Sequence, residues 1–140
     1  MILFCDSSAL VKLYVQEEGS DAVALHATAS ESLAVCRITW VEVMSTLARR
    51  SRERAQDTTT LATARRRFAD DWPRHLCLEL TPELAELAGD YAEAFALRAY
   101  DSIQLAAAEI ARRSLTGELR FACYDIRLSK AARVLGLNVP

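Results

Sequence analysis

Two short apolar segments of the sequence each run directly into an aspartate: Ile2–Cys5 precedes Asp6, and Phe121–Tyr124 precedes Asp125. If both segments are strands of a parallel sheet, both carboxylates lie at the carboxyl ends of strands, where such sheets bind ligands. Each aspartate also precedes a predicted helix, and aspartate is a favoured residue at a helix N-cap. For either aspartate taken alone, capping explains the pattern at least as well as chemistry does.

Two further acids have the same double interpretation. Asp101 opens an alanine-rich helical segment and could cap it, while Glu42 follows Thr39 at the spacing of a capping box. On a helical wheel the apolar residues around Glu42 point away from it, whereas Ser45 and Arg49 share its side. Glu42 therefore faces either water or a polar site, and the periodicity fits both.

The first of these junctions brings several oxygen ligands together. Asp6, Ser7 and Ser8 place one carboxylate and two hydroxyls where a strand meets a helix. Carboxylates gathered in one crevice repel each other unless a cation compensates, and their oxygens suit Mg²⁺ or Mn²⁺ better than Zn²⁺. Such a metal activates water and neutralises phosphoryl charge, so this arrangement favours phosphodiester hydrolysis without a histidine base.

Motifs for other chemistries are absent. The sequence contains neither a glycine-rich phosphate-binding loop nor a G-x-S-x-G nucleophile elbow. His26 and His75 have no motif partners, which favours structural or surface roles. The four cysteines are too widely spaced for a zinc site, which favours buried, reduced thiols. A carboxylate pair that acts on a glycosidic bond remains an open alternative.

The composition indicates one ordinary globular domain. The chain has 140 residues, of which 51% are hydrophobic and 26% charged, with a formal net charge of −2. No apolar run approaches the roughly 20 residues that span a bilayer. The amino end has no basic stretch before its first charge at Asp6, unlike a signal peptide. We expect a single cytoplasmic domain over residues 1–140, with no membrane contact.

The basic residues are mostly arginines and are unevenly placed. They cluster at Arg49, Arg50, Arg52 and Arg54, and again at Arg65, Arg66, Arg67 and Arg74. The planar guanidinium matches the geometry of phosphate, so a local phosphate-binding face is one interpretation. A solvated helix face is the other, and it is favoured by this feature alone.

Short apolar runs alternate with longer helical patterns, which is typical of a parallel sheet covered by helices on both faces. Strands are predicted at Ile2–Cys5, Leu33–Cys36, His75–Leu80 and Leu119–Tyr124, and Leu137–Val139 fits an edge strand. Helices are predicted at Ser8–Val15, from Gly19 to Thr28, and at Thr39–Arg54, Thr60–Asp71, Pro82–Phe95, Asp101–Leu115 and Arg127–Leu135.

Four segments also carry a family resemblance. They are Phe4–Tyr14, Arg37–Glu42 with Leu47–Arg50, Leu97–Ala106 and Tyr124–Gly136. In order and spacing they resemble the PIN-domain ribonucleases and, among them, the VapC-type toxins of bacterial toxin–antitoxin pairs. The resemblance implies an α/β fold, a PIN-like three-layer α/β/α sandwich with a mostly parallel sheet of four or five strands. It also implies an Mg²⁺- or Mn²⁺-dependent endoribonuclease.

The resemblance assigns roles to particular residues. The acidic quartet of the family matches Asp6, Glu42, Asp101 and Asp125. Asp6 and Asp101 correspond to the principal metal ligands, and Glu42 and Asp125 would complete the shell directly or through water. Ser8 corresponds to a hydroxyl that supports the site. The resemblance further implies a homodimer inhibited by a VapB-type antitoxin, whose tail enters the groove.

Two positions depart from the family pattern. Cys123 stands where Ser or Thr is frequent, and Gln104 where His is common, which we interpret as tolerated variation. With RNA as the substrate, Arg49 and Arg50 become candidates for holding RNA or antitoxin near Glu42. Two alternatives remain: a non-catalytic PIN-like module that binds a partner protein, and a nuclease with a broader nucleic-acid substrate.

Overall fold

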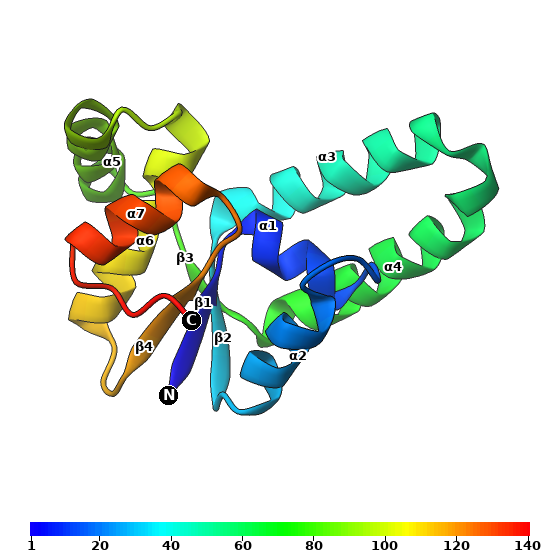
Figure 1. The fold of residues 1–140 in the computed structure, drawn as a ribbon, viewed down its shortest axis with the longest axis horizontal. Helices are drawn as coiled ribbons and strands as arrows, with labels where there is room; N and C mark the ends of the chain where they lie inside the picture. The colour runs from blue at the N-terminus through cyan, green and yellow to red at the C-terminus, as the bar shows by residue number, and fades with distance from the viewer.

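A single four-stranded sheet organises the chain (Figure 1). The computed structural model describes all residues from 1 to 140, with strands in the order β3-β2-β1-β4. Their bounds are β1 Ile2–Cys5, β2 Ser32–Cys36, β3 Leu76–Leu78 and β4 Leu119–Ala122. Every pairing is parallel, so the carboxyl ends of all four strands lie at one edge of the sheet. The expected parallel sheet is confirmed with four strands.

Seven α-helices and three short 3-10 helices connect and cover the strands. The α-helices are α1 Ser7–Leu10, α2 Ser20–Thr28, α3 Arg37–Glu53, α4 Thr58–Asp71, α5 Pro82–Phe95, α6 Ala99–Ser114 and α7 Ile126–Val134. The 3-10 helices are η1 Val11–Leu13, η2 Ala55–Asp57 and η3 Trp72–Arg74. None of the helices is both long and apolar enough to cross a membrane.

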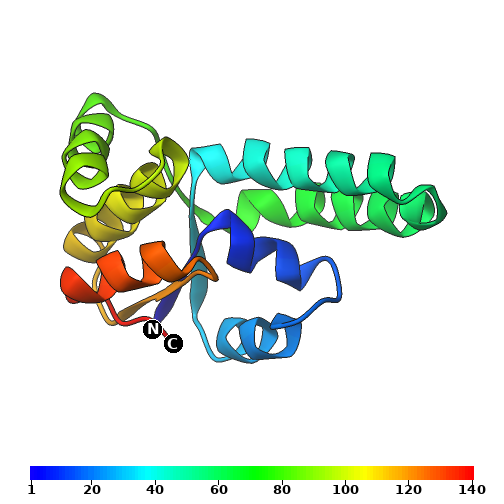
Figure 2. The same cartoon turned by 45° about the horizontal axis from the view of Figure 1, so that its top comes forward.

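Both faces of the sheet are covered, and alternation along β1 shows it directly. Leu3 and Cys5 pack into a core with α1 to α4, whereas Phe4 packs into a second core with α5, α6 and α7. Successive side chains of a strand point to opposite faces, so one short strand contributes to two cores. Figures 1 and 2 show these two helical layers on either side of the sheet.

The pair α3 and α4 extends away from the sheet as two long antiparallel helices (Figure 2). An aromatic cluster fixes its base: the ring of Phe68 lies 5.2 Å from Trp40, 5.4 Å from Tyr14 and 5.5 Å from Trp72. Tyr14 also donates a hydrogen bond of 3.1 Å to Asp71 Oδ2. These contacts hold α3 against the segment that follows β1.

Several predicted boundaries differ from the observed ones by one or two residues. The strand predicted at His75–Leu80 is only Leu76–Leu78, and Leu137–Val139 forms no strand but a single bridge between Arg120 and Asn138. The helix predicted at Ser8–Val15 is one α-helical turn followed by η1. The apolar patterns extend past the residues that pair, because apolar residues also pack in the turns.

The predicted capping box at Thr39 is also wrong. Helix α3 begins at Arg37, so Thr39 lies inside the first turn rather than at the N-cap. Its hydroxyl accepts a hydrogen bond of 2.8 Å from the buried Gln104 side chain instead. Likewise α6 begins at Ala99 with Arg98 at its N-cap, so Asp101 does not cap that helix.

The four cysteines are free thiols, as expected from their spacing. Cys5 and Cys36 are buried, and Cys77 and Cys123 are partly buried. Burial raises the pKa of each of these thiols. They therefore behave as small apolar side chains of the two cores rather than as reactive groups.

Candidate active site

Asp6 stands directly at the carboxyl end of β1 and is only 3% exposed. Its Oδ1 accepts hydrogen bonds from the Ala9 amide at 2.9 Å and the Ser8 hydroxyl at 2.7 Å. The predicted helix cap is therefore confirmed for Asp6. Capping occupies only one carboxylate oxygen, so it does not compete with a second role for the other.

The electrostatic environment of Asp6 is unfavourable for its negative charge. Burial raises the pKa of Asp6 to about 7, although hydrogen bonds from Ser8 and Ala9 oppose the rise. The nearby carboxylates of Glu42 and Asp101 contribute to this rise. Three acids from β1, α3 and α6 thus lie within electrostatic reach of one another, which a set of independent helix caps does not require.

Glu42 projects from α3 toward this site, and a buried side chain of the core holds it in place. Gln104 donates a hydrogen bond of 2.8 Å from Nε2 to Glu42 Oε1. Burial and, to a smaller extent, the charge of Asp101 raise the pKa of Glu42. Hydrogen bonds from Gln104 and Ser7 oppose the rise. Gln104 is a site residue that the sequence interpretation dismissed as variation, because its partner lies 62 positions away in the chain.

Asp101 and Asp125 form the other half of the site. Burial and the charge of Asp125 raise the pKa of Asp101, while Arg98 opposes the rise. Arg98 reaches both acids, with Nε 3.4 Å from Asp101 Oδ2 and Nη2 3.8 Å from Asp125 Oδ2. Asp125 caps α7 as predicted, through a 2.9 Å hydrogen bond from the Leu128 amide. A cavity of about 510 Å³ borders these residues.

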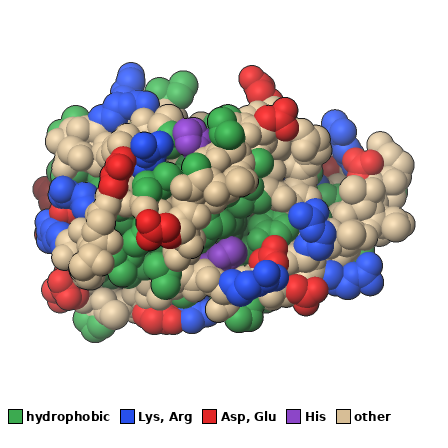
Figure 3. All heavy atoms as spheres, turned by 90° about the horizontal axis from the view of Figure 1, so that it is seen from below, with side chains coloured by type: hydrophobic (Ala, Val, Ile, Leu, Met, Phe, Trp, Pro, Cys, Tyr) green, Lys and Arg blue, Asp and Glu red, His purple; other side chains and the backbone are tan.

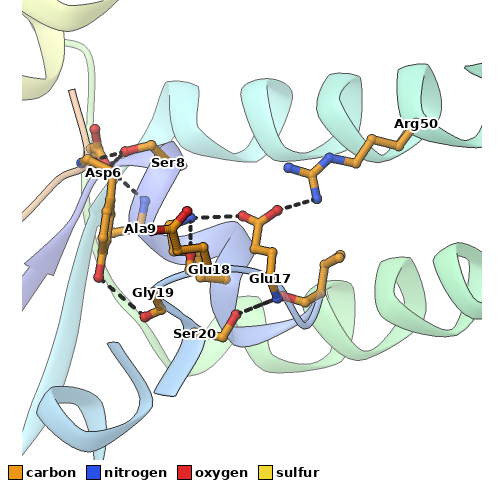
Figure 4. Close-up of polar contacts among 11 residues, drawn as sticks. Asp6, Ser8, Ala9, Glu17, Glu18, Gly19, Ser20 and Arg50 are labelled. Carbon is orange, nitrogen blue, oxygen red and sulfur yellow. Dashed lines mark hydrogen bonds and ion pairs between the residues drawn. The ribbon is translucent and has the colours of Figure 1, made fainter. Parts of the chain in front are cut away.

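Ser8 connects the ends of the two strands that carry aspartates. Its hydroxyl donates to Asp6 and accepts a 3.0 Å hydrogen bond from the Tyr124 amide, just after β4. Figure 4 shows Ser8 directed at Asp6 from the first turn of α1. Nearby, Cys123 lies 3.0 Å from the Ser129 hydroxyl, and burial raises the pKa of its thiol to about 12. Cys123 is therefore neutral.

The four predicted acids are brought to one end of the sheet, but they do not form a closed cage. Electrostatic coupling links Asp6 to Glu42 and Asp101, Glu42 to Asp101, and Asp101 to Asp125. No three carboxylate, thiol or imidazole groups converge closely enough to form a complete metal-binding cluster. The donors available are oxygens only, and Asp6 Oδ2 accepts no hydrogen bond. This donor set fits a hard divalent cation that keeps several waters.

The two predicted contact arginines differ in their surroundings. Arg49 shares a cavity of about 420 Å³ with Glu42, Ser45 and Thr46, as the helical wheel predicts. Arg50 instead forms an ion pair with Glu17, its Nη1 lying 2.8 Å from Oε2. Of the two arginines, only Arg49 therefore lines a cavity together with Glu42.

The histidines take no part in the site. Burial lowers the pKa of His75, whose ring packs 6.1 Å from that of Trp72. Figure 3 views the molecule from below Figure 1, at the end of the sheet where the strands begin, and shows histidine side chains on that face. Acidic and basic side chains are interspersed there, with no extended patch of one sign.

Comparison with known proteins supports the PIN-like fold described above. The PIN domain family matches residues 3–134. The chain is 31% identical to "Ribonuclease VapC45" and "Ribonuclease VapC49" from two strains of Mycobacterium tuberculosis, over 99% of this chain and 94% of each relative.

Solved structures with the same fold are less similar in sequence. FitAcB from Neisseria gonorrhoeae superposes with a TM-score of 0.67 at 17% identity, covering 99% of this chain and 96% of that one. A toxin-antitoxin complex from Klebsiella pneumoniae gives 0.63 at 21% identity, covering 89% and 87%. VapBC2 from Rickettsia felis, bound to a DNA fragment from its promoter, gives 0.63 at 13% identity, covering 100% and 98%. The sandwich predicted from the sequence is confirmed, and the chain belongs to the PIN-domain family.

Proposed function

We propose that this chain is a metal-dependent endoribonuclease that acts as the toxin of a toxin–antitoxin pair. The two Mycobacterium tuberculosis relatives, which align with almost the whole chain, are named ribonucleases. The similar solved structures include a toxin-antitoxin complex and a VapBC assembly. These names agree with an acidic site at the carboxyl ends of a parallel sheet.

The observation that carries the proposal is the buried, electrostatically strained carboxylate of Asp6. An isolated carboxylate in this position costs free energy, because burial and two neighbouring acids disfavour its charge. A helix cap alone does not call for this arrangement, since Ser or Asn caps a helix equally well. A divalent cation bound at Asp6 Oδ2 would compensate the charges of all three acids.

The proposed roles follow from the surroundings of each acid. Asp6 and Asp101 would hold an Mg²⁺ or Mn²⁺ ion, and Glu42 and Asp125 would complete its shell directly or through water. When bound, such an ion lowers the pKa of water and neutralises charge on a phosphodiester. Ser8 fixes the orientation of Asp6. Gln104 fixes that of Glu42.

The proposal includes a partner and a place of action. By the family resemblance, a VapB-type antitoxin inhibits the protein, and its tail enters the groove at the acidic site. Self-association as a homodimer and action in the cytoplasm belong to the same proposal. Four unpaired cysteines agree with a reducing compartment.

Cleavage of a defined single-stranded RNA tests the proposed activity. We expect the wild-type protein to cut it with Mg²⁺ or Mn²⁺ and not in EDTA. Asp6→Asn keeps the helix cap but removes a charge, so cleavage should fall at least about 100-fold. Asp90→Asn, at an exposed acid of α5, is the control for net charge and should cut normally.

Three results would contradict the proposal: cleavage that persists in EDTA, full activity of Asp6→Asn, or no cleavage under any metal condition. The last result would favour the non-catalytic binding module. A deoxyribose copy of the same oligonucleotide, cut as fast as the RNA, would favour a nuclease of broader substrate range.

A further inference from the structure

A third cavity adjoins the acidic site, across Ser7 and Ser8. It measures about 400 Å³ and lies between α1, η1 and α3. Its lining consists of three cations, three hydroxyls, one acid and one aliphatic side chain: Lys12, Arg49, Arg50, Ser7, Ser8, Thr46, Glu17 and Val11. This cavity is rich in hydrogen-bond donors and positive charge, in contrast to the four acids beside it.

Glu17 occupies part of the cavity in an arrangement that resembles a bound anion. Its Oε1 accepts from Lys12 Nζ at 3.1 Å, and its Oε2 lies 2.8 Å from Arg50 Nη1. Figure 4 shows the Glu17 carboxylate directed at Arg50. Burial alone would raise the pKa of Glu17, but Lys12 and Arg50 hold it below its ordinary value. Two non-bridging oxygens of a phosphodiester could accept from the same donors.

Arg49 is the cation in this cavity that remains available. Its side chain is 59% exposed, and its contact with Glu53 is long, at 3.9 Å. Three cations against one carboxylate leave two positive charges in the cavity. One of these two charges is shared by Lys12 and Arg50 around Glu17, and the other is carried by Arg49.

We propose that this cavity is a subsite for a backbone phosphate of RNA, at a linkage next to the one that is cut. Arg49 and the hydroxyl of Thr46 contact the phosphate, while Glu17 competes with it for Lys12 and Arg50. The inference rests on the proposed function, because RNA supplies the phosphate. It adds a binding site separate from the metal ligands and an internal competitor that limits RNA affinity.

Two substitutions should change the RNA affinity in opposite directions, which distinguishes this subsite from simple surface ion pairs. Arg49→Ala should weaken RNA binding, because it removes a contact to phosphate. Glu17→Gln should strengthen binding, because it frees Lys12 and Arg50 for the ligand. If the Lys12–Glu17–Arg50 ion pairs only stabilise the loop before α2, Glu17→Gln should leave binding unchanged or weaken it.

Binding of a fluorescent single-stranded oligoribonucleotide, measured by anisotropy in EDTA, provides the test. At low salt we expect Arg49→Ala to raise the Kd about fivefold and to reduce the slope of log Kd against log salt by about 0.7. Glu17→Gln should lower the Kd about two- to threefold. Arg52→Ala makes the same charge change on α3 but lines a different cavity, with Leu47 and Ala48, so its effect should stay below twofold.

Neutral linkages identify the contacted phosphate. In a series of RNAs with one methylphosphonate each, one linkage should weaken wild-type binding and abolish the effect of Arg49→Ala. Equal effects of Arg49→Ala and Arg52→Ala, no sensitive linkage, or Glu17→Gln binding no tighter than wild type would overturn the subsite. Competition by inorganic phosphate at matched ionic strength, without a sensitive linkage, would instead assign the cavity to a free phosphate ligand and also overturn it.

A parallel cleavage assay with Mg²⁺ separates this inference from the proposed function. Metal-dependent cleavage by the wild-type protein, with no difference between Arg49→Ala and Arg52→Ala in binding, contradicts the subsite alone. Absence of cleavage by the wild-type protein contradicts the proposed function. Because Arg49 is exposed and forms no close ion pair, its substitution decides the question even if Glu17→Gln fails to fold.

Discussion

Gln104 on α6 donates hydrogen bonds of 2.8 Å to two residues of α3, Glu42 Oε1 and Thr39 Oγ1. The amide is 1% exposed, so both bonds are shielded from water. One side chain therefore joins two helices from opposite faces of the sheet and fixes the orientation of a site carboxylate. Its own Oε1 is buried and has no hydrogen-bond partner, so the amide is retained at some energetic cost.

We predict that Gln104→Met weakens the binding of Mn²⁺. Methionine has a similar volume but no donor, so Glu42 would lose the hydrogen bond that orients it. Loss of a group that orients a metal ligand typically lowers affinity about tenfold or more. Isothermal titration calorimetry with MnCl₂ measures the change without reference to catalysis.

Thr39→Val is the matched control for Gln104→Met. It removes the other hydrogen bond of the same amide and leaves the bond to Glu42 in place. We expect reduced stability with nearly unchanged Mn²⁺ affinity. Equal losses of Mn²⁺ affinity in both variants would show that Gln104 acts only by joining the helices.

We predict that Arg98→Ala strengthens Mn²⁺ binding about two- to fivefold at low ionic strength. The guanidinium lies near both Asp101 and Asp125 and competes for their negative charge. Because Arg98 is 80% exposed, the gain should disappear near 0.5 M salt, as screening weakens the pairs. Arg127 lines the same cavity and forms no ion pair, so Arg127→Ala should change affinity much less. Weaker Mn²⁺ binding by Arg98→Ala would contradict the competition.

We predict that Asp6→Asn stabilises the metal-free protein at neutral pH. Burial raises the pKa of Asp6 to about 7 in the folded state, against about 3.9 when unfolded. Folding therefore favours the protonated acid, and the stability present below pH 4 is lost as the pH rises toward 7. The variant cannot ionise, so it avoids this loss.

Urea unfolding in EDTA at several pH values measures this difference. We expect Asp6→Asn to exceed the wild type by roughly 2–4 kcal/mol at pH 8 and to match it near pH 4. Saturating Mn²⁺ should make the wild type more stable than Asp6→Asn at pH 8, because only the wild type binds the ion well. A variant less stable than the wild type in EDTA at pH 8 would show that the Asp6 charge is not strained.

We predict that Gly19→Ala destabilises the protein more than Gly117→Ala does. Both glycines have positive φ, +88° and +99°, which an alanine adopts only with strain. A Cβ at Gly117 meets open space, whereas one at Gly19 would lie 2.8 Å from Tyr124 Cε1. The Tyr124 hydroxyl also bonds the Gly19 carbonyl, so the ring cannot move freely.

The expected losses are about 1 kcal/mol for Gly117→Ala and about 2–3 kcal/mol for Gly19→Ala. Urea unfolding of the two variants under identical conditions gives both values. Equal losses would mean that the Tyr124 ring yields to the new methyl group, and that the loop before α2 is not fixed against Tyr124.

Local signals in the sequence were sufficient for much of the fold. Apolar runs predicted β1, β2 and β4, and the Thr81–Pro82 start predicted α5 with the bounds observed. The positions of Asp6 and Asp125 at strand ends followed from the same runs. These features depend on residues adjacent in the chain, which periodicity and capping preferences describe well.

Contacts between distant segments were not predictable in the same way. The Thr39–Glu42 spacing fits a capping box, but α3 begins at Arg37. The hydrogen-bond partner of Thr39 is Gln104, 65 residues away. The Lys12–Glu17–Arg50 ion pairs likewise join η1 to α3. No local pattern marks such partners, because a polar residue inside a helix has the same periodicity whether it meets water or another side chain.

The most direct test of the proposed metal site is the position of Mn²⁺ in crystals grown with MnCl₂, located by its anomalous scattering. We expect a peak roughly 2 Å from Asp6 and Asp101 oxygens, with Glu42 and Asp125 nearby, and no such peak in crystals of Asp6→Asn. A wild-type crystal at saturating Mn²⁺ with no peak among these acids, each still capping or pairing as it does here, would contradict it.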